Sequence, residues 1–146
     1  MFDLHFSPFK ENGLVSCGVK QISFWNLIGN TLQKKKGIFG DTKDIQTMFS
    51  VVPGKATNTY FAGTMNGQIY FWKENNLEEK ISGVHDGIIY CITEYEDKYI
   101  TGGKDGRIRI WDSGFQPIDG FDLKEIVNKN LSTHDSFYEE GKISNI

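Results

Sequence analysis

The sequence predicts an all-β fold assembled from one β-hairpin module that occurs three times. In residues 99–112, apolar and β-branched residues lie on both sides of Asp105-Gly106, a dipeptide that favours a tight turn between two strands. Residues 60–73 have the same layout with Asn66-Gly67 at the turn. Residues 14–25 form a third copy that is one residue shorter at its turn and lacks the acidic residue. We therefore expect three homologous hairpins.

The tryptophans test this alignment. All three tryptophans of the chain, Trp25, Trp72 and Trp111, close a module, at spacings of 47 and 39 residues. These spacings lie near the period of WD40 repeats, about 40–45 residues. Three unrelated hairpins would not share this position, and an isoleucine also lies three residues before each tryptophan. These isoleucines are Ile22, Ile69 and Ile108.

Each repeat has the strand content of one four-stranded blade of a WD40-type β-propeller. We expect blade 1 in residues 1–40, blade 2 in 41–82 and blade 3 in 83–123, then a polar loop and the start of a further strand in 124–146. Propellers close with about four to eight blades. About three antiparallel blades would leave the ring open, so further blades would come from the parent chain or from another chain. The expected strands are 2–7, 14–18, 22–26, 31–35, 45–52, 59–64, 68–73, 77–81, 88–93, 98–103, 107–112 and 115–123.

Composition narrows the functional classes. A chain of 146 residues is normally one domain. Its net charge of −3 supplies no field that would draw it to nucleic acid or to an anionic membrane. Two cysteines, Cys17 and Cys91, make neither a disulfide framework nor a metal site. The sequence has no secretory signal and no membrane-spanning stretch, so we expect a cytoplasmic protein. We also expect no metal and no cofactor.

Four polar and aromatic residues of the third repeat form a candidate site. His85, Thr101, Asp105 and Trp111 occupy the positions of the structural tetrad of WD40 repeats, which this part of the sequence resembles. The expected arrangement is a relay of hydrogen bonds from carboxylate to imidazole, to hydroxyl, to indole N–H. A hydrolase with Thr101 as nucleophile is the catalytic alternative, but the repeat explains the same residues without it. We therefore expect no enzyme activity.

The other two repeats lack parts of this relay. The second has Ala62 and Asn66 at the positions of the threonine and the aspartate, and the first has Val15 and Val19. We therefore expect Trp25 and Trp72 to stabilise their blades by packing alone.

Candidate contacts for a protein partner fall in two groups. Lys34, Lys35 and Lys36 form the one dense basic cluster, which either keeps an edge strand soluble or attracts an acidic partner. The hairpin turns place Lys20, Met65 and Lys104 towards one face of the ring.

Specific stretches resemble the echinoderm microtubule-associated protein-like family. They are residues 14–25, 37–40 followed by 45–47, and 101–106 with 108–112, and the resemblance covers residues 2–123. It implies tandem propellers that bind tubulin or microtubules in cytoskeletal or ciliary settings. We therefore expect a non-catalytic scaffold for protein–protein interaction at the cytoskeleton, with the ciliary axoneme as one such setting. The alternative is a WD40 adaptor or substrate receptor with no role at tubulin.

Overall fold

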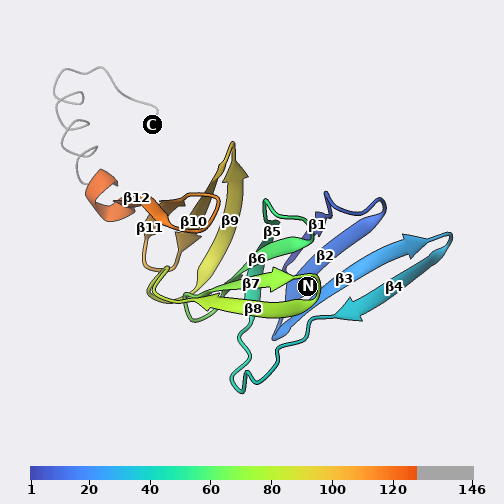
Figure 1. Cartoon of the computed structure of the whole chain (residues 1–146). Coiled ribbons are helices and arrows are strands. Elements are labelled where there is room, and N and C mark those ends of the chain that lie inside the picture. Colours follow the sequence, from blue (N-terminus) through green and yellow to red (C-terminus); the bar gives the residue numbers. More distant parts are fainter. Residues whose placement is uncertain (128–146) are drawn as a thin grey trace, which may run out of the picture.

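The computed structural model describes residues 1–127, which form three four-stranded antiparallel sheets (Figure 1). Each sheet contains four consecutive strands, and the strands are paired in chain order. The predicted all-β fold with about three antiparallel blades is confirmed. Blade 1 contains β1 (Asp3–Phe6), β2 (Gly13–Gly18), β3 (Gln21–Ile28) and β4 (Thr31–Lys36). Blade 2 contains β5 (Met48–Pro53), β6 (Thr59–Thr64), β7 (Ile69–Lys73) and β8 (Asn76–Ile81). Blade 3 contains β9 (Ile89–Tyr95), β10 (Lys98–Gly103), β11 (Arg107–Trp111) and β12 (Pro117–Asp122).

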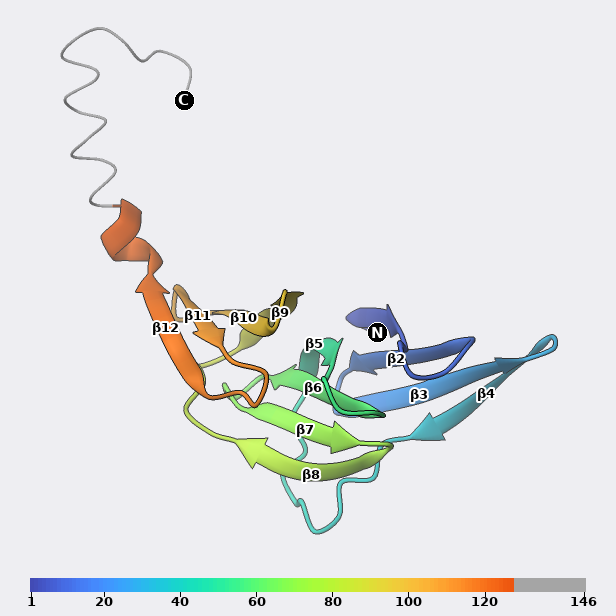
Figure 2. The same ribbon diagram turned by 45° about the horizontal axis from the view of Figure 1, so that its top comes forward.

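The three blades follow an open arc (Figure 2). The first strands β1, β5 and β9 lie on its inner side, and β5 contacts both of the others. The fourth strands β4, β8 and β12 lie on the outer side. The described residues therefore form a propeller segment whose two end blades each have one face without a neighbouring blade.

The core between blades 1 and 2 explains why β5 is apolar except at Ser50. Side chains alternate between the two faces of a strand, and β5 is covered on both faces. Val51 packs towards blade 1, whereas Val52 packs towards blade 3. Trp72, which is fully buried, lies in the core shared with blade 1. The buried members of that core are Val15, Cys17, Ile22, Met48, Val51, Tyr60, Ala62, Tyr70 and Trp72.

Aromatic rings dominate the core between blades 2 and 3. The ring of Phe61 lies 5.0 Å from Phe71, 5.2 Å from Tyr99 and 4.5 Å from Phe115, measured between ring centres. Trp111 stacks on Phe115 at 5.6 Å. This cluster attaches blade 3 to blade 2 through large apolar surfaces.

A polar contact crosses all three inner strands. The Ser50 hydroxyl in β5 donates to a carboxylate oxygen of Asp3 in β1 at 3.1 Å, and the backbone N–H of Val51 donates to the same oxygen at 2.9 Å. The Ser50 hydroxyl also accepts a hydrogen bond from the backbone N–H of Ile92 in β9 at 3.1 Å. One buried serine thus connects the three blades, a link that the sequence did not predict.

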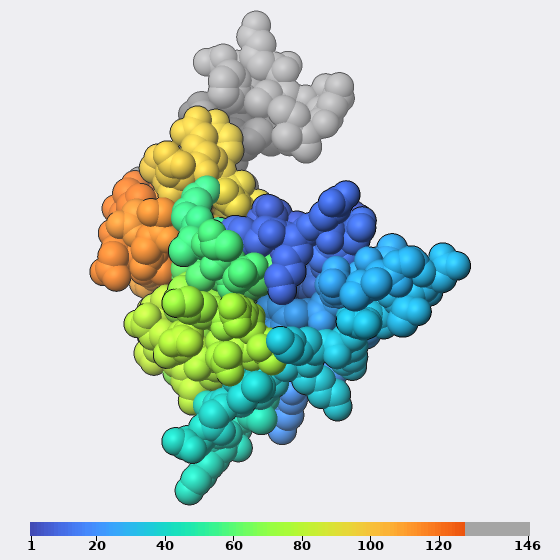
Figure 3. Space-filling view, turned by 45° about the vertical axis from the view of Figure 1, so that its right-hand side comes forward, coloured from blue at the N-terminus to red at the C-terminus, as the bar shows by residue number. Residues whose placement is uncertain are grey.

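The end of the arc at blade 1 exposes apolar side chains. Trp25, Trp72 and Trp111 occupy equivalent positions, opposite Leu14, Tyr60 and Tyr99 on the neighbouring strands. Trp72 and Trp111 pack against the preceding blade, whereas Trp25, in the first blade, has none to pack against and is half-exposed. The β3–β4 hairpin projects from the body beside it (Figure 3). Exposed apolar residues in this blade include Leu4, Phe6, Leu27 and Leu32.

Two local features differ from the expected elements. The strand expected from residue 45 begins at Met48, because its partner β6 ends at Thr64 and the chain turns at Met65. Residues 123–127 are helical, whereas we expected residue 123 to end a strand and residues 124–127 to begin a polar loop. The Asp122 carboxylate caps this helix by accepting a hydrogen bond from the backbone N–H of Lys124 at 2.9 Å. The rest of the predicted loop and the strand start at 142–146 lie outside the described residues. Within the described residues, no helix has the length and apolar character needed to cross a membrane.

Candidate functional site

The structure places His85, Thr101, Asp105 and Trp111 in one continuous chain of hydrogen bonds. The two Asp105 carboxylate oxygens lie 2.9 and 3.1 Å from His85 Nδ1. His85 Nε2 lies 2.7 Å from the Thr101 hydroxyl, which lies 2.9 Å from Trp111 Nε1. The expected order, from carboxylate to imidazole to hydroxyl to indole, is the order found.

The indole of Trp111 fixes one direction in this chain of hydrogen bonds. An indole N–H can only donate, so the Thr101 oxygen accepts from Trp111. The same hydroxyl has a proton of its own that it can donate to His85 Nε2, and His85 Nδ1 faces the Asp105 carboxylate. Thr101 is completely buried, with both sides of its hydroxyl engaged. A nucleophile has to reach substrate, so this geometry favours a structural role for Thr101.

Hydrogen bonds hold the Asp105 carboxylate in its charged form. Burial by itself raises the pKa of this carboxyl. The backbone N–H of Asp86, the His85 side chain and the backbone N–H of Arg107 more than offset that effect, so the pKa of Asp105 is lower than its usual value. The Asp105 carboxylate therefore anchors the loop that carries His85 and the turn between Asp105 and Arg107.

Asp105→Asn is expected to reduce the free energy of unfolding most at neutral pH and less in acid. A carboxyl whose pKa is lowered in the folded state stabilises the fold above its unfolded pKa, about 4. That contribution is lost as the pH falls below about 4, towards the lower folded pKa. The difference in stability between the two proteins should therefore shrink below about pH 4, as measured by urea unfolding at several pH values. A difference independent of pH would contradict the charged role of Asp105.

The loop that carries His85 also contacts blade 2. The His85 backbone N–H donates to the Gly67 carbonyl at 3.2 Å, and the Lys104 backbone N–H donates to the Ile88 carbonyl at 2.8 Å. The polar chain of blade 3 is thus joined to the hairpin turn of the preceding blade, so it supports the interface between two blades as well as one blade.

Blade 1 contains part of the same relay, contrary to the expectation from the sequence. The strand register makes Ser16, not Val15, the equivalent of Thr101, because the shorter turn of the first repeat shifts the alignment by one residue. The Ser16 hydroxyl accepts a hydrogen bond from Trp25 Nε1 at 2.8 Å. The expectation that Trp25 acts by packing alone was therefore wrong.

Blade 2 has no hydroxyl at the position of Thr101, so the indole N–H of its tryptophan lacks the acceptor found in the other two blades. Ala62 stands at the position of Thr101, two residues after the strand partner of the tryptophan. Within residues 1–127, the buried Trp72 Nε1 has no hydrogen-bond partner. A buried donor without a partner lowers stability by about 1–3 kcal/mol.

Ala62→Ser is expected to raise the free energy of unfolding by about 0.5–1.5 kcal/mol, because the new hydroxyl would accept from Trp72 Nε1. Urea unfolding measures the change. Trp72→Phe removes the donor, so the gain should disappear in that background. An equal gain in both backgrounds would show that the serine acts by another route.

A row of aromatic rings runs across the beginnings of the inner strands. Phe2 stacks on Phe49 at 5.0 Å between ring centres, and Phe49 meets Tyr90 edge-on at 6.0 Å. Each blade contributes one ring. Phe49 and Tyr90 both lie at bulges, where the strand register shifts. Phe2 and Tyr90 are 52% and 53% exposed.

The predicted turn residues belong to the same end of the blades. Lys20, Met65 and Lys104 lie in the turns between the second and third strands. These turns are attached to the beginnings of the inner strands, since the Met65 N–H donates to the Thr47 carbonyl and the Lys104 N–H to the Ile88 carbonyl. We call these turns and the aromatic row the turn face. Its members are Phe2, Lys20, Phe49, Met65, Tyr90 and Lys104.

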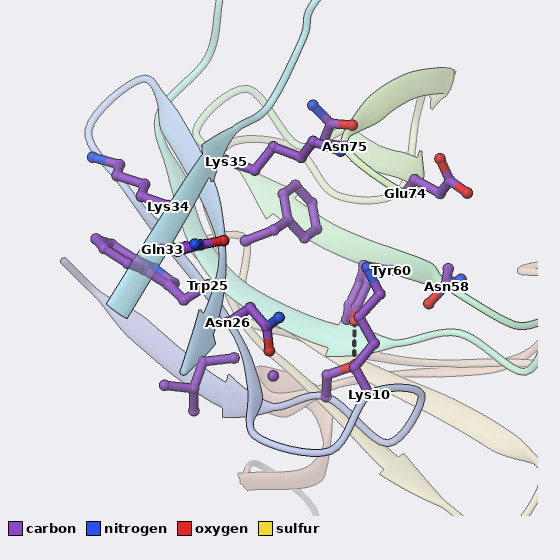
Figure 4. Close-up of a pocket in the computed structure, with 14 residues that line it drawn as sticks. Lys10, Trp25, Asn26, Gln33, Lys34, Lys35, Asn58, Tyr60, Glu74 and Asn75 are labelled. Carbon is purple, nitrogen blue, oxygen red and sulfur yellow. Dashed lines mark hydrogen bonds between the residues drawn. The ribbon is translucent and has the colours of Figure 1, made fainter. Parts of the chain in front are cut away.

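The lysine cluster lies elsewhere. Lys34, Lys35 and Lys36 occupy the outer strand β4, and Lys34 and Lys35 line a pocket between blades 1 and 2 (Figure 4). The structure therefore separates the two groups of candidate contacts. Sequence reasoning missed both the aromatic row and the pocket, because each combines residues from different repeats. Among residues 1–127, no group of three or more His, Cys, Asp or Glu side chains is arranged to hold a metal ion.

Comparison with known proteins identifies the family. The family model described as the echinoderm microtubule-associated protein first beta-propeller matches residues 1–140. The chain belongs to this family. The resemblance in its hairpins is thereby confirmed, and the three blades are blades of an echinoderm microtubule-associated protein propeller.

Relatives within this family are much longer than the chain. Echinoderm microtubule-associated protein-like 1 of Mus musculus is 29% identical over 129 residues, covering 86% of this chain and 16% of the relative. The 77 kDa echinoderm microtubule-associated protein of Lytechinus variegatus is 30% identical over 76% of this chain and 17% of its own length. A ciliary WD repeat-containing protein, ctxp80 of Euplotoides octocarinatus, is 35% identical over 80% of this chain and 16% of its own length. The chain thus spans about one sixth of these relatives.

Solved structures support the propeller fold. The beta-propeller domain of Cps50 (Swd1) from Myceliophteria thermophila matches 75% of this chain and 38% of that domain, with a TM-score of 0.66 and 13% identity. The computationally designed Ika8 protein matches 82% of this chain and 36% of its own, with a TM-score of 0.58 and 20% identity.

Proposed function

We propose that this chain is a non-catalytic scaffold segment of a microtubule-associated propeller and that it contacts tubulin or another cytoskeletal protein. The observation that carries the proposal is the family match over residues 1–140, to a propeller of microtubule-associated proteins. The names of its relatives support a cytoskeletal or ciliary location. The complete burial of Thr101 supports the non-catalytic part of the proposal, because a hydrolase nucleophile has to reach its substrate.

The turn face is the proposed contact surface. Interfaces are enriched in aromatic and methionine side chains and depleted of charge at their centres. Phe2, Phe49, Tyr90 and Met65 supply such a centre, and Lys20 and Lys104 add positive charge in the adjoining turns. Further blades, from the parent chain or another chain, would cover the exposed apolar face of blade 1 and complete the ring.

Co-sedimentation with microtubules tests the proposal. We expect the chain to pellet with microtubules at low salt and Tyr90→Ala to weaken pelleting. Tyr95→Ala is the matched control, since Tyr95 lies at the far end of the same strand and is 63% exposed. The double variant Lys20→Glu and Lys104→Glu should also pellet less than the unmodified chain. This difference should be largest at low salt, where exposed charges are least screened.

Two outcomes would change the assignment. Equal loss of pelleting with Tyr90→Ala and Tyr95→Ala would place the contact outside the turn face. No pelleting at low salt would remove the tubulin role and leave the alternative, a WD40 adaptor or substrate receptor unconnected to tubulin.

A further inference from the structure

The pocket between blades 1 and 2 is separate from the turn face and has its own chemistry (Figure 4). Its volume is about 430 Å³, within the range of ligand pockets. Blade 1 contributes the β1–β2 loop, the start of β2 and residues of β3 and β4, and blade 2 contributes the start of β6 and the β7–β8 turn. Figure 4 shows these two sets on opposite sides, with Lys34 and Trp25 on one and Asn58 and Glu74 on the other.

The pocket has an aromatic wall. Phe24 and Tyr60 meet at 5.3 Å between ring centres, and the Tyr60 hydroxyl is held by the Ser7 hydroxyl at 2.7 Å. Both rings also pack in the core between the blades, so the wall is rigid. A rigid apolar wall can accept an apolar side chain of a ligand without first becoming ordered.

The charge of the pocket is opposite to that of the whole chain. The chain has a net charge of −3, yet Lys10, Lys34 and Lys35 line the pocket with Glu74 as the one carboxylate. None of these three lysines forms an ion pair within residues 1–127. All three lysines are exposed, and the Lys34 ammonium lies 5.2 Å from the centre of the Trp25 ring. These lysines are therefore available to carboxylates of a ligand.

Amide side chains complete the lining. Asn26, Gln33 and Asn58 line the pocket, and their side chains form no hydrogen bond with other described residues. Amides both donate and accept, which suits the alternating N–H and C=O groups of a peptide main chain. They are distributed over both blades, which fits an extended ligand.

We infer that this pocket binds an extended acidic peptide that carries an apolar side chain. The apolar side chain would lie against Phe24 and Tyr60, carboxylates on either side would meet Lys10 and Lys35, and the amides would bind the main chain. This site is independent of the proposed contact at the turn face. Its partner is an extended segment of an acidic protein with this pattern.

Fluorescence anisotropy with a labelled peptide tests this inference. The probe is a short peptide in which glutamates flank one phenylalanine. Lys35→Glu and Lys10→Glu are each expected to weaken binding at least about fivefold, because each reverses a charge that meets a carboxylate. Lys98→Glu is the matched control, since it makes the same charge change at an exposed position of β10 that belongs neither to the pocket nor to the turn face, and it should leave the affinity unchanged. Raising the salt from roughly 50 mM to roughly 300 mM should also weaken binding.

Peptide variants separate the parts of the site. Replacement of the glutamates by glutamine should abolish the salt dependence of binding. Replacement of the phenylalanine by alanine should weaken binding but leave its salt dependence unchanged. Equal affinity for the glutamine peptide, equal effects of Lys35→Glu and Lys98→Glu, or tighter binding of a single-stranded oligonucleotide would each overturn the inference. Microtubule pelleting that persists in Lys35→Glu would leave the proposed function intact, so the two can fail separately.

Discussion

Trp111→Ala is expected to lower the free energy of unfolding by about 3–5 kcal/mol. Trp111 is 5% exposed and stacks on Phe115 in the core that joins blades 2 and 3. Its removal would leave a cavity there. The Thr101 hydroxyl would also lose the indole donor that orients it towards His85. Urea unfolding, with the midpoint and the slope both recorded, measures the loss.

Trp25→Ala is the matched control for this prediction. Trp25 holds the equivalent position in blade 1 and donates to Ser16, but its ring is half-exposed. Since less apolar surface is buried, the loss should be well below that of Trp111→Ala. Similar losses for the two substitutions would mean that another part of the protein covers Trp25 in solution.

Gly67→Ala is expected to destabilise the chain by about 2–4 kcal/mol, the sum of backbone strain and a steric clash. Gly67 has a φ of +81°, which side-chain-bearing residues rarely adopt. A Cβ atom there would overlap the backbone carbonyl oxygen of His85 and approach that of Gly87 to 2.9 Å. Backbone atoms cannot rotate away as a side chain can, so the turn of blade 2 and the His85 loop would have to separate.

Gly106→Ala separates these two causes. Gly106 holds the same turn position in blade 3 with a φ of +74°, but a Cβ atom there would meet nothing within 4 Å. Only the backbone strain applies, about 1–2 kcal/mol. The difference between the two variants in thermal or urea unfolding measures the contact between blades. Equal losses would show that the contact contributes nothing to stability.

Hairpin positions were predictable because they depend on local signals. Strand residues alternate or run apolar between turn dipeptides such as Asn66-Gly67 and Asp105-Gly106, and most expected strands match the observed ones to within a few residues. The order of the polar chain from Asp105 to Trp111 was likewise expected from residues of one repeat and the loop before it. Its distances came only from the fold.

Features that join different repeats were not predictable. Asp3, Ser50 and Ile92 are far apart in the sequence, and nothing near any of them indicates the other two. Phe2, Phe49 and Tyr90 form a row only because successive blades place their inner strands side by side. The pocket lined by Lys10 and Lys35 depends in the same way on how blade 1 meets blade 2.

The sequence by itself determined that this protein is built from one repeated hairpin, because the spacing of strands and turns is a local property. Only the tertiary structure decided what each copy of the repeat does. Trp25 is half-exposed, Trp72 is buried without a hydrogen-bond partner, and Trp111 is buried with one. Equivalent residues differ in this way because burial and hydrogen bonding depend on the neighbouring blade and on the strand register.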